Sequence, residues 1–175
     1  MYKLKETMKK IELPADFSPE ERQRRAEEIF QRGYNCCQSV LLAFADIIEG
    51  VDEQTLATVG SGLGGGVARM REVCGAVSGM AIVAGFISPA TNPENMAERT
   101  ANYALVQRFS AEFKKERGSI VCRELLGLRA EEAKLEPPKP AGRTQQYYHS
   151  RPCVVNVGLA ARIVADYLAV EFESV

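Results

Sequence analysis

The hydrophobic pattern along the chain is that of successive helices. Apolar residues recur every three or four positions in most segments, and no segment alternates apolar and polar residues as a half-buried strand does. Helix-capping residues and glycines separate these segments. We therefore predict an all-α fold, a single-domain bundle of about six or seven helices formed by residues 18–175. Residues 1–17 are interpreted as an N-terminal extension.

Two capping boxes mark the first helices. Ser18 followed by Glu21, with proline between them, predicts a helix that runs to about residue 32. Asn35 followed by Gln38 predicts a second helix, apolar nearly all round, that ends near Gly50. Further helices are expected over about residues 52–59, 72–87, 92–117, 119–127 and from 152 onward. The polar stretch 129–150 contains EPPKPAG and favours a loop with one helical turn near Glu131.

A glycine-rich segment, GSGLGGGVARMRE, occupies residues 60–72. So many glycines rule out a stable helix interior and indicate a loop or a tight chain crossing. The phosphate-loop pattern GxxxxGK[ST] is absent, and no predicted strand precedes the segment, so nucleotide binding is disfavoured. Arg69 and Arg71 beside this loop are expected to be solvated.

Composition narrows the class of protein. The chain has 175 residues, 46% of them hydrophobic, which is enough for one core. A net charge of -1 and the absence of tryptophan argue against a nucleic-acid partner. The N-terminus lacks the apolar stretch of a secretory signal, so we expect a cytoplasmic protein with reduced thiols. The uncharged stretch 73–90 is interpreted as a buried helix rather than a membrane span.

Four of the five cysteines fall at or near predicted helix starts. They are Cys36, Cys74, Cys122 and Cys153. The start of a helix offers unpaired backbone N–H groups and partial positive charge, which favour thiolate over thiol. A thiolate is both the nucleophile of disulfide exchange and a ligand for soft metals. Single buried cysteines are often only small hydrophobic residues, but four similarly placed ones indicate a shared site.

Cysteine spacing does not identify a metal. The sequence has no CxxC pair, no zinc-finger arrangement and no ferredoxin-type run. Any metal site must therefore be assembled by the tertiary fold. His149, the single histidine, is expected to be an exposed loop residue rather than a ligand.

The chain resembles the C-GCAxxG-C-C family, whose members are described as redox-active proteins. The resemblance extends from about residue 25 to 168. It rests on GYNCCQSVL, GGGVARMREVCGAVSG, CRELLG and a late cysteine before an apolar helix. The four family cysteines correspond to Cys36, Cys74, Cys122 and Cys153. Cys37 stands where the family usually has a small residue, and we expect it to point away from the other four.

The CGAxxG element places Gly75, Ala76 and Gly79 beside Cys74, and these three residues are candidates to contact a cofactor. The resemblance implies redox chemistry, with an iron–sulfur cluster on the four cysteines as the first hypothesis. The second hypothesis is a thiol–disulfide oxidoreductase or redox sensor without metal. The third is a structural zinc site. The sequence identifies no redox partner, substrate or electron donor, and leaves both enzymatic activity and a homodimer open.

Overall fold

The computed structural model describes residues 11–129 and 137–173. Within these residues the fold is all-α, as predicted, with only two isolated backbone bridges in place of a sheet. The helices are α1 (Pro19–Gln31), α2 (Cys36–Leu42), α3 (Glu53–Gly60), α4 (Gly75–Ile87), α5 (Met96–Arg117), α6 (Cys122–Leu125), α7 (Gln145–His149) and α8 (Cys153–Glu173). Two 3₁₀ turns, η2 (Ala45–Ile47) and η3 (Ser61–Leu63), follow α2 and α3.

Side-chain caps start several of these helices where the sequence predicts them. The Asn35–Gln38 capping box is complete, and Asp52 caps α3 through the Thr55 amide at 2.7 Å. The first predicted box is only half formed. Ser18 accepts from the Glu21 amide at 3.3 Å, but the Glu21 carboxylate turns to Arg24. The arginine competes for that carboxylate, so only one of the two box contacts is made.

Five helices differ from the predictions in their bounds. Helix α6 covers only Cys122–Leu125 of the predicted segment 119–127. Helix α2 ends at Leu42, and the turn η2 follows after two residues. Helix α4 begins at Gly75 rather than near residue 72. Helix α5 begins at Met96, where Asn95 caps the Glu98 amide, four residues after the predicted start. Helix α7 lies inside the predicted loop and is capped by Thr144, whereas Glu131 lies outside the described residues.

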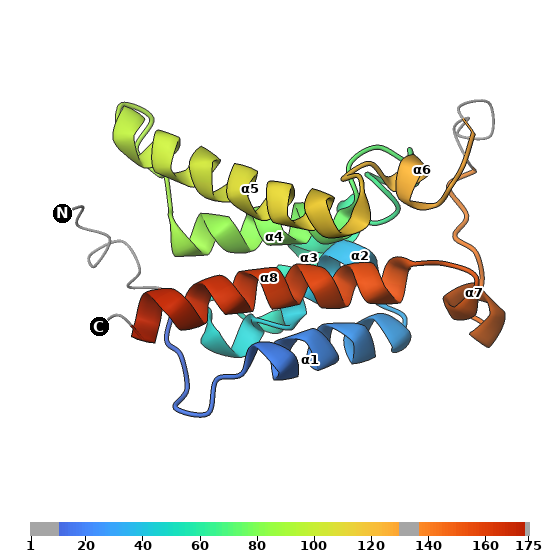
Figure 1. Ribbon diagram of the computed structural model, residues 1–175, viewed down its shortest axis with the longest axis horizontal. Coiled ribbons are helices and arrows are strands. Elements are labelled where there is room, and N and C mark those ends of the chain that lie inside the picture. The colour runs from blue at the N-terminus through green and yellow to red at the C-terminus, as the bar shows by residue number, and fades with distance from the viewer. Residues whose placement is uncertain (1–10, 130–136, 174–175) are drawn as a thin grey trace.

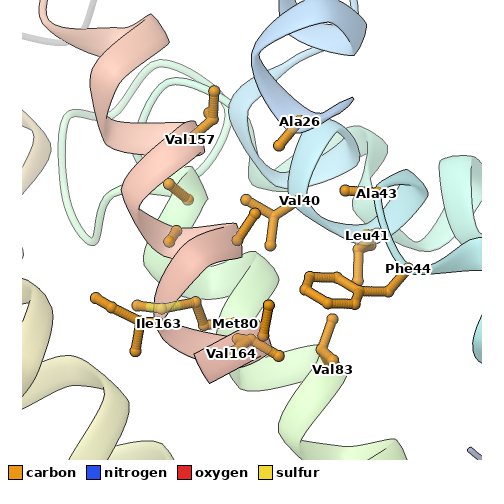
Figure 2. Packing of buried hydrophobic residues seen from close by; sticks show 14 of the residues in the cluster. Ala26, Val40, Leu41, Ala43, Phe44, Met80, Val83, Val157, Ile163 and Val164 are labelled. Atoms are coloured by element: carbon orange, nitrogen blue, oxygen red, sulfur yellow. The ribbon is translucent and has the colours of Figure 1, made fainter. Parts of the chain in front are cut away.

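The long helices pack side by side around one core. Helix α8 packs most extensively on α1, and α4 contacts α2, α5 and α8 (Figure 1). Figure 2 shows Val40 and Phe44 from the α2 segment, Met80 and Val83 from α4, and Val164 from α8 meeting in that core. At one end of the bundle lie α6, α7 and the start of α8 (Figure 1).

Helices α2 and α4 touch almost backbone to backbone. A Cβ atom at Gly79 would lie 2.7 Å from the Val40 Cβ, and one at Gly75 would lie 3.0 Å from the Cys36 Cβ. The first separation is shorter than real carbon contacts, and a Cβ at Gly75 would also lie 2.8 Å from the Leu63 carbonyl oxygen, so both positions favour glycine. The CGAxxG element is therefore the surface of α4 that lets the starts of the two helices approach.

The glycine-rich segment forms a left-handed turn. Residues 65–69 all have positive φ, and so does Arg71 at 62°. Four of these six residues are not glycine, and each such residue costs about 1–2 kcal/mol in this conformation. Backbone bonds from Arg71 N to Gly65 O (3.2 Å) and from Glu72 N to Gly66 O (3.0 Å) close the turn. The prediction of a tight chain crossing is confirmed.

Within the described residues, one helix is long and apolar enough to cross a membrane by length and composition. It is the Cys153–Glu171 part of α8, and half of it is buried inside the bundle. A core helix of this length passes the same test, so the finding is weak evidence for a span. The apolar stretch that the sequence singled out forms the 13-residue buried helix α4.

The α2–α4 contact predicts opposite effects for two glycines of α4. Gly79→Ala places a methyl group against Val40 and should lower the free energy of unfolding by about 1–3 kcal/mol. Gly85→Ala has no atom within 4 Å of the new methyl group and should raise it by about 0.5–1 kcal/mol through helix propensity. Urea denaturation measures both, and equal effects would contradict the close crossing.

Candidate redox centre

Four cysteines line one small cavity at the end of the bundle. The cavity measures about 50 Å³, enough for a few water molecules. Cys36, Cys122 and Cys153 are the first residues of α2, α6 and α8, and Cys74 is the residue before α4. The structure thus brings the four predicted cysteines together and places each at a helix start. The other residues around the cavity are Asn35, Gly65, Arg71, Gly75, Leu125, Leu126, Arg143, Tyr147, Arg151 and Asn156.

Backbone pairing ties the start of α4 to the start of α6. Val73 and Val121 form an antiparallel bridge. The Cys74 amide donates to the Ile120 carbonyl at 2.8 Å, and the Cys122 amide donates to the Glu72 carbonyl at 2.6 Å. Because amide and carbonyl groups on both sides are used, the two cysteines are held at fixed positions beside each other.

Two glycines leave room for backbone segments to pass close to Cys36 and Cys122. Gly75 allows the α4 start to lie against Cys36, as described above. Gly66 has a positive φ of 66°, and a Cβ there would lie 2.6 Å from the Cys122 Cβ. The glycine run therefore lets the left-handed turn pass directly behind Cys122.

The left-handed turn places the buried side chain of Arg71 at the cavity. Arg71 is only 3% exposed, and its Nη1 donates to the Cys122 sulfur at 3.9 Å. The expectation that Arg71 is solvated is therefore wrong. Its positive φ turns the chain so that the side chain enters the cavity rather than solvent. Arg69 is half-buried, and its Nε donates to the Pro137 carbonyl at 3.0 Å.

Two further arginines reach the cavity from the α7 region. The Arg143 and Arg151 guanidinium groups each lie 4.8 Å from the centre of the Tyr147 ring. Arg143 also lies 4.7 Å from the Phe30 ring and donates to the Tyr34 carbonyl at 3.3 Å. Sequence reasoning missed all three residues. Their spacing, with an arginine four residues before and four after Tyr147, was the available signal.

A hydrogen bond couples Cys36 and Cys153. It lowers the pKa of Cys153 to about 7, helped by the positive charges of Arg151 and Arg143 and opposed by burial. The same bond raises the pKa of Cys36 well above its ordinary value, and burial adds to that rise. The Cys153 sulfur is therefore about half thiolate near pH 7, whereas the Cys36 thiol stays protonated.

Burial controls the other thiols. It raises the pKa of Cys74 to about 12, although the Ala76 and Val77 amides at the start of α4 act in the lowering direction. Burial also raises the pKa of Cys122, against the opposing effect of Arg71. The expected thiolate-favouring effect of the helix starts is therefore outweighed at these cysteines, because loss of water disfavours the charged form more strongly.

The remaining sequence candidates lie outside the cavity lining. Cys37 is fully buried in the hydrophobic core, where burial raises its pKa to about 12. Ala76 is also in the core, and Gly79 faces Val40. His149 is exposed, as expected. Of the CGAxxG residues after the cysteine, only Gly75 borders the cavity.

A comparison with protein-family models matches residues 34–167 to the family described as "Putative redox-active protein (C_GCAxxG_C_C)". The chain belongs to the C-GCAxxG-C-C family. The match begins just before Cys36 and ends after Cys153, so it contains the whole cavity lining. No curated protein and no solved structure matches the chain.

In this C-GCAxxG-C-C protein the cavity side chains that could bind a metal are the four cysteines, and three arginines also line the cavity. In the part of the chain that the structure describes, no group of three or more His, Cys, Asp or Glu side chains is arranged to hold a metal ion. Four thiols are the donors that either a zinc ion or an iron–sulfur cluster would use.

The unequal thiols predict a reactivity order. In the reduced, metal-free protein, alkylation of Cys153 by N-ethylmaleimide should rise to half its maximum near pH 7, because its thiolate forms there. Cys37 and Cys74 should stay unreacted over the same range, because their pKa is about 12. Peptide mass spectrometry after timed quenching measures each site. Equal alkylation of Cys37 and Cys153 at pH 7 would contradict the assignment.

Proposed function

We propose that the protein is an electron carrier in which Cys36, Cys74, Cys122 and Cys153 together hold an iron–sulfur cluster. The observation that carries this proposal is that four cysteines from four separate helix starts line one cavity. A dithiol oxidoreductase needs two cysteines, and a merely structural role for four thiols would not require them to share a cavity. Four thiolate ligands are the usual protein contribution to such a cluster.

The surroundings suit a group that carries negative charge. Arg71, Arg143 and Arg151 border the cavity. The amides of Ala76 and Val77 act on the Cys74 sulfur. Positive charge and N–H donors near thiolate sulfurs raise a cluster's reduction potential, which is how a protein tunes such a group. A bound cluster would supply one-electron transfer, and the chain's residues would hold it and set its potential.

Anaerobic reconstitution with iron and sulfide tests the proposal. The wild-type protein should retain both elements after desalting and show broad visible absorbance. Replacing Cys36, Cys74, Cys122 or Cys153 by alanine should abolish or sharply reduce iron retention. Cys37→Ala is the matched control and should retain iron, because Cys37 lies in the core. A wild type that retains no iron, or a Cys37→Ala protein that loses it equally, would contradict the proposal.

A second candidate function rests on Cys36 and Cys153, which line the same cavity and shift each other's pKa in opposite directions. The Cys153 thiolate would attack a substrate disulfide, form a mixed disulfide and release one substrate thiol. Cys36 would then attack the Cys153 sulfur and release the second substrate thiol. Two electrons pass from the protein to the substrate, which leaves a Cys36–Cys153 disulfide. The lowered pKa of Cys153 favours its role as the attacking sulfur.

Glutathione disulfide tests this second function in the metal-free protein. We expect a Cys36–Cys153 disulfide as the main product, detected by non-reducing peptide mapping. In Cys36→Ala the mixed disulfide on Cys153 should persist, whereas Cys37→Ala should behave as wild type. A product dominated by Cys74 or Cys122 would contradict the assignment. Either function requires thiols kept reduced, as in a cytoplasmic compartment.

A further inference from the structure

Two asparagines line the cysteine cavity, and the first of them, Asn35, uses both ends of its side-chain amide. Its Oδ1 accepts from the Cys37 and Gln38 amides at 2.9 and 3.0 Å. Its Nδ2 donates to the Gly60 and Ser61 carbonyls at 3.1 and 3.0 Å. Asn35 is therefore fully occupied in holding the backbone around the start of α2.

The second asparagine, Asn156, is held from one end. It is 3% exposed and lies one turn after Cys153 on α8, so the two side chains share a face of the helix. Arg117, the last residue of α5, donates from Nε to Asn156 Oδ1 at 2.8 Å. Because a guanidinium group can only donate, the amide atom that faces it must be the oxygen. The Nδ2 group of Asn156 is therefore the end that is left for another partner.

The position of Asn156 Nδ2 follows from which polar atoms are buried. Within the described residues, no group accepts a hydrogen bond from it. In the same part of the chain, the fully buried side-chain nitrogen or oxygen that lacks a partner is Arg143 Nη1 alone. Asn156 Nδ2 must therefore still reach accessible space, although the residue is nearly buried. The cysteine cavity is the space that Asn156 lines, so Nδ2 is turned toward it.

We propose that Asn156 donates an N–H hydrogen bond to a sulfur of the redox centre and raises its reduction potential, with Arg117 as the positioning residue. The inference rests on the proposed function, in which the four cysteines hold an iron–sulfur cluster. Reduction adds negative charge to such a cluster, so a hydrogen bond to its sulfurs is stronger in the reduced state. The donor therefore favours reduction, and its removal should lower the potential.

Spectroelectrochemical titration of the reconstituted protein measures this effect. In Asn156→Leu the equilibrium constant for one-electron reduction should fall about tenfold, the order of one charge-assisted hydrogen bond, which is about 59 mV. Asn102→Leu is the matched control and should keep the wild-type potential. Asn102 lies outside the cavity lining and donates to the Ser88 carbonyl at 2.9 Å, at the end of α4 away from Cys74. Iron content is measured for each variant, so that only loaded proteins are compared.

A double-mutant cycle tests the role of Arg117. Arg117→Met keeps a long side chain but removes the N–H groups, so Asn156 is no longer held and the potential should fall. Lys114→Met removes an equal charge one turn earlier on α5 and measures the effect of charge alone. In an Asn156→Leu background, Arg117→Met should lower the potential no further than Lys114→Met does, because the group that Arg117 orients is gone.

An isosteric variant decides the question if Asn156→Leu fails to load with iron. Asn156→Asp keeps the shape and the Arg117 contact but presents an oxygen to the cavity, so its potential should fall at least as far. The proposal is overturned, and the cluster assignment kept, if loaded Asn156 variants have the wild-type potential or a higher one. Loss of iron from both variants also overturns it, since Asn156 would then only hold the fold. A wild type that binds no iron contradicts the proposed function, and this inference with it.

Discussion

The close contact between α2 and α4 is the constraint on which the site depends. Gly75 and Gly79 remove the side chains that would separate the helices, so the backbone of α4 lies against Cys36 and Val40. This contact brings the start of α2 to the start of α4. The Val73–Val121 bridge then adds the start of α6, and the packing of α8 on α1 and α4 adds Cys153. The glycines therefore matter for the site because they let the cysteine-bearing helix starts lie close together.

Two opposing electrostatic effects act on the sulfurs once they are together. Helix starts and arginines favour thiolate, whereas burial in a small cavity favours neutral thiol. At Cys74 burial dominates, and at Cys153 the hydrogen bond from Cys36 and the nearby arginines dominate. Four thiolates in one buried cavity would need compensating positive charge, which the proposed metal ions would supply. The strained turn that places Arg71 in the wall adds to that charge, in keeping with the tendency of backbone strain to occur at functional sites.

The sequence predicted the part of the site that local rules govern. Asn35 and Pro152 are helix-start residues, so the placement of Cys36 and Cys153 followed from capping preferences alone. The sequence singled out Gly75 and Gly79 as candidates to contact a cofactor, whereas the structure shows that they let α4 approach α2. The positions of Arg71, Arg143 and Arg151 at the cavity could not be predicted in this way. Arg71 looks like a loop cation in the sequence, and only its left-handed backbone and the burial of the turn place it against Cys122.

The missed helix starts have a similar origin. Asn92 and Asn95 are both good helix-capping residues, and Pro93 favours the earlier start. In the structure Asn92 accepts from the Glu94 amide in a turn, and Asn95 caps α5. The α7 segment reads as polar loop because its five residues carry no apolar stripe. It forms where Tyr148 packs edge-on against Phe30 and donates to the Gln31 carbonyl at 3.1 Å. Long-range contacts of this kind leave no local periodicity in the sequence.

The central claim is that the four cysteines act as one iron-binding redox centre. X-ray absorption at the iron edge of anaerobically loaded protein tests it most directly, because the fine structure reports the atoms bound to iron. The account predicts a first shell made of sulfur alone and a second shell that contains iron. A first shell of oxygen or nitrogen, as expected for iron bound adventitiously at the surface, would contradict it.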